Sequence, residues 1–302
     1  MATEDAVATG SRTLAPASSV VVDVPDERRK RSRWRPTAAA AVGIVIIVVV
    51  TLGAIGADVV APFSPTSQNL RDRLQPPSAT HLFGTDNLGR DILSRTVYGA
   101  RVSLVVGVTA ALLAGSLGVL LGLVAGYQGG WSDALLSRIA DVQQAIPFLI
   151  LAIAVAVIVG PSLTNVVLVL AVTAWVSYFR VVRAEVLSVR ESLLVDAVRT
   201  LGASTSRIVV RHVLPNVSAS VIVIASLMVA NMIIFEASLS FLGLGVPPPT
   251  PTWGRMVYDG VQYVDSAWWL SLFPGLAIVI TVMAINLVGD WLRDALDPRI
   301  QA

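Results

Sequence analysis

The residues that could perform covalent or metal chemistry are few in this 302-residue chain. It contains two histidines, His81 and His212, a single lysine, Lys30, and no cysteine. Without cysteine, a thiolate nucleophile and a thiolate zinc site are excluded, and no H-E-x-x-H metal motif is present. A P-loop needs a lysine in the pattern G-x-x-x-x-G-K-[ST], and Lys30 lies in a basic run instead. We therefore predict that the chain is not an enzyme and holds no cofactor, so that any ATP hydrolysis belongs to a partner.

A buried charge is the second kind of chemistry to consider, because Glu236 lies inside a strongly apolar segment together with Asn231. An ionised group at the bilayer centre costs roughly 2.5–3.5 kcal/mol on insertion scales, and such groups usually have a function. Glu236 lies toward one end of its segment, which makes it a candidate outer gate or structural residue. Direct contact with a substrate and a plain interfacial position are the alternatives. Asn286 is the other polar candidate in an apolar segment.

The most regularly patterned polar stretch is "SVRESLLVDAVRTLGASTSRIVVRHVLPN", residues 188–216. Ser188 and Glu191 have capping-box spacing, and apolar residues follow at helical spacing. Gly202 comes where a helix end favours positive φ, and Pro215 would interrupt a second short helix. Helices of about ten residues are not stable alone in water. The pair therefore needs a surface, which is either a docked partner or the lipid headgroup layer.

The rest of the chain is strongly hydrophobic and has the composition of a membrane protein. Its residues are 55% hydrophobic and 14% charged, against about 25% charged in soluble domains. Several apolar runs reach the length of about 20 residues that spans a bilayer. We predict an all-α, polytopic membrane protein whose six transmembrane helices are 37–57, 102–126, 142–160, 164–183, 217–242 and 268–291.

Two polar segments lie outside these spans. Residues 1–35 are rich in small and acidic residues and end in "RRKRSRWR", so we expect a disordered, basic, cytoplasmic tail before the 36–302 membrane domain. With the N-terminus inside, sixteen Lys and Arg residues face the cytoplasm and six face outward, which favours two cytoplasmic termini. The outer loop 58–101 weakens this rule, because it carries five of those six arginines. The cytoplasmic loop is 184–216, and the net charge of +2 does not suggest a nucleic-acid partner.

Small residues recur at every fourth position of the second predicted span, at Ala114, Gly118, Gly122 and Gly126. This spacing puts them on one stripe of a helix, where another helix can approach closely in lipid. The stripe predicts helix packing, within the chain or with a partner subunit.

The 188–216 stretch resembles the cytoplasmic "EAA" loop of binding-protein-dependent ABC importer permeases. In that family an acidic residue, small residues, a glycine, an apolar run and Leu-Pro form the helix that couples to a separate ATPase. The resemblance carries over to Asp196, Ala197, Gly202, Ala203, Ile208, Leu214 and Pro215. Asp196 replaces the usual Glu and keeps its charge, whereas Val198 replaces a small residue and adds bulk to the contact face.

Four further blocks extend the resemblance over nearly the whole chain after the tail. They are "HLFGTDNLGRDILSRTVYGARVSL", "GGWSDALLSRIADVQQAIPFLILAI", "EASLSFLGLGVPPPTPTWGRMV" and "NLVGDWLRDALDPR". Together they resemble the C-type permease of the dipeptide and oligopeptide branch. His81-Leu82-Phe83 departs from the commoner His-Pro-Phe.

The resemblance implies a type I, MetI-like permease fold in a bacterial inner membrane. It also implies a paralogous permease, two ATP-binding subunits that hold ATP and Mg²⁺, an extracytoplasmic substrate-binding protein, and short peptides as substrate. The segment 85–98 would be an amphipathic helix on the outer surface, capped by Thr85 or Asp86, which either lies in the headgroups or contacts the binding protein. An ion-coupled carrier or channel that acts alone and a membrane scaffold that docks an ATPase without transport are the alternatives.

Overall fold

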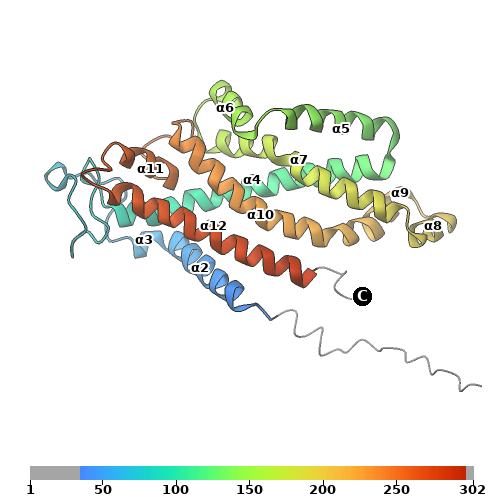
Figure 1. Ribbon diagram of the computed structural model, residues 1–302, viewed down its shortest axis with the longest axis horizontal. Coiled ribbons are helices and arrows are strands. Elements are labelled where there is room, and N and C mark those ends of the chain that lie inside the picture. Colours follow the sequence, from blue (N-terminus) through green and yellow to red (C-terminus); the bar gives the residue numbers. More distant parts are fainter. Residues whose placement is uncertain (1–34, 297–302) are drawn as a thin grey trace, which may run out of the picture. The chain divides into compact units, whose positions relative to one another are not determined.

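A computed structural model describes residues 35–296 of the chain (Figure 1). The predicted basic tail falls outside the described residues except for Arg35, and so do residues 297–302. The described part is all-α, as predicted, and its only β-type pairing is an isolated bridge between Thr85 and Asp91. We name the two ends of the helical unit after the short helices found there: the α8 end, with α8 (Leu193–Thr200), and the α11 end, with α11 (Trp253–Val261).

Long helices alternate with short ones, and the longest connection, residues 61–91, lies between α3 and α4. In chain order they are α2 (Ala38–Ile55), α3 (Ala57–Val60), η1 (Leu70–Asp72), α4 (Ile92–Gln128), α5 (Gly130–Ala145), α6 (Phe148–Val159), α7 (Leu163–Arg190), α8 (Leu193–Thr200), α9 (Thr205–Ile208), η2 (Val209–Val213), α10 (Leu214–Phe241), α11 (Trp253–Val261) and α12 (Trp269–Leu296). α4, α10 and α12 run side by side, α7 packs along α4, and α2 lies against α12.

The predicted number of spans is confirmed, with one change of shape. In residues 35–296, five helices are long and apolar enough to cross a membrane: α2, α4, α7, the continuous α9–η2–α10, and α12. The predicted straight span 142–160 is wrong. Its sequence contains Pro147, which has no N–H and disfavours helix at the residue before it. α5 and α6 therefore meet at an angle of 92° and make a sixth span only as a bent pair.

The predicted separate helix 85–98 is also wrong. α4 begins at Ile92, and the side chain of Asp91 caps it by accepting a hydrogen bond from the Ser94 amide at 2.7 Å. Residues 85–91 are a loop, because Asp86 Oδ1 accepts hydrogen bonds from the amides of Leu88 and Arg90 and holds a turn. The second span therefore begins before its predicted start at residue 102, and it is one helix from Ile92 onward.

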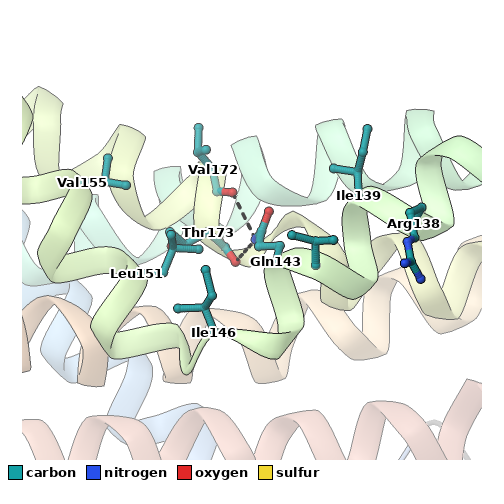
Figure 2. Close-up of a pocket in the computed structure, with 9 residues that line it drawn as sticks. Arg138, Ile139, Gln143, Ile146, Leu151, Val155, Val172 and Thr173 are labelled. Atoms are coloured by element: carbon teal, nitrogen blue, oxygen red, sulfur yellow. Dashed lines mark hydrogen bonds between the residues drawn. The ribbon is translucent and has the colours of Figure 1, made fainter.

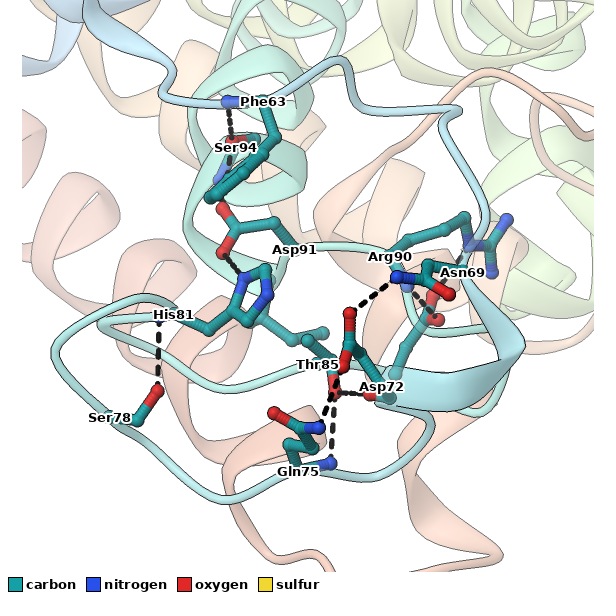
Figure 3. Close-up of polar contacts among 12 residues, drawn as sticks. Phe63, Asn69, Asp72, Gln75, Ser78, His81, Thr85, Arg90, Asp91 and Ser94 are labelled. Carbon is teal, nitrogen blue, oxygen red and sulfur yellow. Dashed lines mark hydrogen bonds and ion pairs between the residues drawn. The ribbon is translucent and has the colours of Figure 1, made fainter.

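Buried polar contacts hold the loop before α4 against the start of that helix (Figure 3). His81 Nδ1 lies 2.9 Å from Asp91 Oδ1, and both side chains are buried. The Thr85 hydroxyl donates to the Asp72 carbonyl and accepts from the Gln75 amide at 2.9 Å. These contacts give the α11 end a fixed structure.

The small-residue stripe of α4 lies against α7 of the same chain. A Cβ atom placed on Gly118 would lie 2.4 Å from the Trp175 carbonyl oxygen, and one on Gly122 would lie 2.9 Å from Val182. Gly126 approaches Val186 in the same way, at 2.8 Å. Only a residue without a side chain allows this separation of the two helices.

Two of the three tryptophans near the α11 end are buried. Trp253 is buried, donates a hydrogen bond from Nε1 to the Thr96 carbonyl at 2.9 Å, and packs against Gly99. Trp269 is also buried and donates to the Thr85 carbonyl at 3.2 Å, whereas Trp268 is exposed. The first two therefore fix tertiary structure, because their N–H groups find partners inside the chain.

Candidate functional site

The α8 end contains a short helix with well-defined boundaries. Ser192 caps its start, where the side-chain oxygen accepts a hydrogen bond from the Val195 amide. At its end the Ala203 amide donates to the Val198 carbonyl and the Gly202 amide donates to the Arg199 carbonyl. This pair of bonds is a Schellman motif, and Gly202 takes the positive φ of 81° that the motif requires. The end of α8 is thus set by backbone hydrogen bonds.

One face of this region anchors it to the helices behind it. Val195 of α8, Ile208 of α9 and Val213 of η2 are buried in one apolar cluster with Val182 and Val186 of α7. α8 is therefore joined to α7 through packed side chains. The region is also joined to α10, because α9, η2 and α10 form one continuous helix.

The opposite face of α8 is apolar and exposed. Leu193 is 88% exposed and Leu201 is 85% exposed, with Leu194 and Ala197 also on the surface. Beside them Arg199 pairs with Asp196 at 3.4 Å. A hydrogen bond with Tyr127 raises the pKa of the Arg199 guanidinium above its ordinary value. Exposed leucines rimmed by a charged pair are typical of a protein-binding surface.

A largely apolar cavity lies inside the bend between α5 and α6, against α7 (Figure 2). Its volume is about 390 Å³. Gln143 closes one side by donating to the Thr173 carbonyl at 2.8 Å while its Oε1 accepts from Trp175 Nε1 at 2.9 Å. Arg138 is the charged residue that lines it. The cavity combines an apolar wall with a few polar groups, as small-molecule sites do.

Glu236 lies away from that cavity, toward the α11 end of α10. Its side chain is fully buried, and its carboxylate accepts hydrogen bonds from the hydroxyls of Ser240 at 2.7 Å and Ser103 at 3.1 Å. The Thr252 hydroxyl donates to Ser240 at 3.3 Å. The carboxylate thus connects α4 and α10 with the segment that leads into α11.

Two family models match the sequence. The model described as "Binding-protein-dependent transport system inner membrane component" covers residues 118–302. The chain belongs to this family. The second, described as "N-terminal TM domain of oligopeptide transport permease C", covers residues 31–77. The resemblance stated from the sequence is therefore confirmed, and the chain is a membrane-embedded permease.

Relatives and a solved structure agree with this assignment. The chain is 46% identical to the dipeptide transport system permease protein DppC of Alkalihalophilus pseudofirmus, over 82% of each chain. It is 42% identical to the oligopeptide transport system permease protein OppC of Bacillus subtilis, over 89% of this chain and 88% of that one. A chain of the inward-facing MetNI methionine ABC transporter shares the fold with a TM-score of 0.56 at 21% identity, over 68% of this chain and 98% of that chain. The expected MetI-like permease fold is confirmed.

The structure divides the residues predicted for coupling into two groups. Asp196, Ala197, Gly202 and Pro215 are exposed, whereas Ile208 is buried and Ala203 and Leu214 pack beside it. The latter three therefore hold the α8 region to the bundle. The apolar face predicted from helical spacing contains Leu194, Ala197 and Leu201, which are exposed, and Val198, which packs toward the bundle. Leu193 was not among the predicted residues, because helical spacing alone cannot tell which apolar residues the bundle covers.

Two boundary predictions near α8 are wrong. Ser188 and Glu191 do not start a helix, because α7 continues to Arg190 and the cap is Ser192. Pro215 does not interrupt the following helix. It lies in the first turn of α10, directly after the π-helical turn η2, where the Leu214 amide donates to the Val209 carbonyl. The continuous helix accommodates Pro215 at this π-helical turn, where the backbone hydrogen-bond pattern changes.

Other polar candidates are not gathered into one site. Asn231 is exposed on α10, and Asn286 lines a groove between α10 and α12. His81 and His212 lie at opposite ends of the unit, in the loop before α4 and in η2. Residues 35–296 contain no group of three His, Asp or Glu side chains that could hold a metal ion.

Replacing Glu236 with leucine should destabilise the protein by about 1–3 kcal/mol, because the hydroxyls of Ser103 and Ser240 would be left buried without their acceptor. Glu236→Gln keeps an acceptor oxygen and a similar shape, so its unfolding temperature in detergent should be close to that of wild type. Equal unfolding temperatures for the leucine variant and wild type would contradict this account. A gating role predicts in addition that Glu236→Gln loses uptake at unchanged stability.

Proposed function

We propose that this permease moves short peptides inward as one of the membrane subunits of an ABC importer, and that α8 couples it to an ATPase. The observation that carries the coupling proposal is the exposed apolar face of α8 on a helix that is capped at both ends. A preorganised helix loses little conformational entropy when it binds a groove. The peptide substrate is supported by the dipeptide and oligopeptide names of the relatives.

We infer the orientation of the permease in the membrane from the positions of its basic residues and from the proposed role of α8. The α8 end carries the basic residues from Arg180 to Arg211, which favours the cytoplasmic side. The α11 end would then face outward, and both termini would be cytoplasmic. The partners are two ATP-binding subunits with ATP and Mg²⁺, a paralogous permease, and an extracytoplasmic substrate-binding protein.

The mechanism is alternating access driven through α8. When the ATPase subunits close on ATP, they displace α8, and the packing of Val195 and Ile208 on α7 carries this displacement into the bundle. α7 also forms one wall of the cavity at the α5–α6 bend. Two ion pairs, Arg183–Asp133 and Arg180–Asp141, tie α5 to α7 so that the helices move together. We place part of the peptide pathway along this wall.

Co-purification and uptake test the proposal together. The tagged chain is purified from mildly solubilised membranes, and uptake of labelled dipeptides and longer peptides is measured in cells with and without the gene. We expect an ATPase and a second permease to co-purify, and peptide uptake to require the chain. Uptake into liposomes by this chain alone, without ATP, would favour an ion-coupled carrier. Capture of the ATPase without any loss of solute uptake on deletion would favour a scaffold.

Gly202 gives a matched pair of variants. Its φ of 81° strains a β-branched residue by about 1–2 kcal/mol, whereas asparagine tolerates this region. A Cβ atom at this position meets no other atom within 4 Å, so the effect is backbone strain alone. We expect Gly202→Val to lower peptide uptake about fivefold to thirtyfold while ATP hydrolysis persists, and Gly202→Asn to retain uptake. Normal uptake by the valine variant would refute the role of this turn.

A further inference from the structure

A second cavity lies at the α11 end and is lined by charged groups. It has a volume of about 210 Å³, well above the roughly 10–15 Å³ that one water molecule needs. The start of α4 and the loop before it contribute Asn87, Arg90 and Arg95, and α11 contributes Arg255 and Asp259. The proline-containing segment before α11 closes the cavity at Pro248–Thr250.

The charges around this cavity do not balance. Three guanidinium groups share two carboxylates: Asp86 pairs with Arg90 at 2.6 Å and with Arg95 at 3.6 Å, and Asp259 pairs with Arg255 at 3.0 Å. One positive charge is left over. Arg95 is only 3% exposed, so this charge lies in a poorly solvated place. A buried charge is costly unless it is paired, which favours a further anionic group.

The geometry of the ion pairs leaves the outer part of each guanidinium group available. In all three ion pairs the carboxylate lies beside Nε. The 3.6 Å between Arg95 Nε and Asp86 exceeds hydrogen-bond length, and Arg95 Nη1 donates to the Pro65 carbonyl at a long 3.3 Å. The Arg255 guanidinium is oriented further by the Tyr258 ring, whose centroid lies 4.9 Å away. Terminal guanidinium nitrogens are the donors that bind carboxylates in pairs.

We propose that this cavity binds one carboxylate group supplied from outside the chain, held by the terminal nitrogens of Arg90, Arg95 and Arg255. Under the proposed function, the α11 end faces the side from which substrate arrives. The carboxylate would then belong either to the C-terminus of a peptide or to an acidic side chain of the substrate-binding protein. In either case the cavity recognises an anionic group that arrives from outside the chain.

The test measures protection of arginines from an arginine-selective dicarbonyl reagent. The full chain, with the subunits that co-purify with it, is placed in lipid nanodiscs and treated with phenylglyoxal, and each modified arginine is quantified by mass spectrometry. The probes are N-acetyl-Ala-Ala and its C-terminal amide, which differ only in the carboxylate. Modification of Arg255 should slow about fivefold when the acid is present at about four times its dissociation constant, since protection follows 1 + [L]/Kd. Arg73, exposed in the loop before α4 and outside the cavity, is the internal control.

The amide should give no protection, and Arg73 should react at one rate throughout. Equal protection of Arg255 by acid and amide, or none by the acid up to about 50 mM, overturns the proposal. Arg95→Gln should abolish protection of Arg255 by the acid. Because this residue is buried, Arg95→Lys provides a second variant that keeps the charge and loses the guanidinium fork, and protection should fall at least about threefold. Wild-type protection in both variants contradicts the site.

Two additional arms identify the source of the carboxylate. Tighter binding of N-acetyl-Ala-Ala than of acetate supports a peptide terminus. Protection by the peptide-free binding protein, with the dipeptide no better than acetate, supports an acidic side chain of that protein. Neither of these two measurements requires ATP or a bound ATPase. Loss of ATPase co-purification with protection intact would therefore reject the proposed coupling and leave the carboxylate site standing.

Discussion

The double variant Leu193→Asp/Leu201→Asp should lose its ATPase and reduce peptide uptake to background. Both side chains are more than four-fifths exposed, so the folded permease does not depend on them. In a docked complex each would be buried, and burying a leucine is worth about 1.5–3 kcal/mol. Losing two therefore costs about 3–6 kcal/mol, or roughly 10²–10⁴ in affinity, before the cost of burying two carboxylates is added.

The measurement is co-purification of the ATPase together with uptake of a labelled peptide. Leu70→Asp is the matched control, because Leu70 is 68% exposed but lies in η1 at the other end of the unit. It should retain both the ATPase and uptake. If the double variant also captures the ATPase and transports normally, α8 is not the docking element, and that result would favour an exposed face that rests on lipid.

Gly118→Ala should destabilise the permease strongly, although it adds a single methyl group inside a helix. The new Cβ would lie 2.4 Å from the Trp175 carbonyl oxygen, 2.6 Å from Tyr178 Cβ and 3.0 Å from the Phe179 amide nitrogen. Two of these atoms are backbone, so relief requires α4 and α7 to separate along their whole contact. Overpacking of this kind costs about 1–3 kcal/mol, which corresponds to a fall of roughly 2–12 °C in the unfolding temperature.

Gly53→Ala is the matched control, because it also places alanine in a transmembrane helix. A Cβ atom on Gly53 meets no other atom within 4 Å, and alanine favours a helix by up to about 1 kcal/mol. Its unfolding temperature in detergent should equal or slightly exceed that of wild type. A Gly118→Ala protein as stable as Gly53→Ala would show that the two helices pack less closely than the structure has them.

These expectations connect the two ends of the molecule. α8 rests on α7 through Val195 and Ile208, and α7 rests on the glycine stripe of α4. α4 begins at the ion-pair network of the α11 end, where Asp91 caps it and Arg95 lines the charged cavity. A displacement at α8 can therefore reach the α11 end through close-packed helices, which transmit strain because interiors are hardly compressible.

The sequence by itself determined the membrane class, the number of spans and the family. Apolar runs of spanning length need no tertiary information, since every such run must satisfy its backbone as a helix in lipid. The close packing at the glycines of α4 and the turn at Gly202 could also be predicted from the sequence, because each depends on local backbone geometry.

Only the tertiary structure decided which faces are covered and where helices end. The bend at Pro147 was not predicted from hydropathy, because hydropathy does not report the angle at which α5 and α6 meet. The loop 85–91 has the composition of a surface helix, yet Asp86, Arg90 and Asp91 are buried, because Asp91 pairs with His81 and Asp86 pairs with Arg90 and Arg95. Likewise Ile208 and Leu201 are equally apolar in sequence, but one lies against α7 and the other is exposed on α8. That difference depends on long-range packing, and no local pattern contains it.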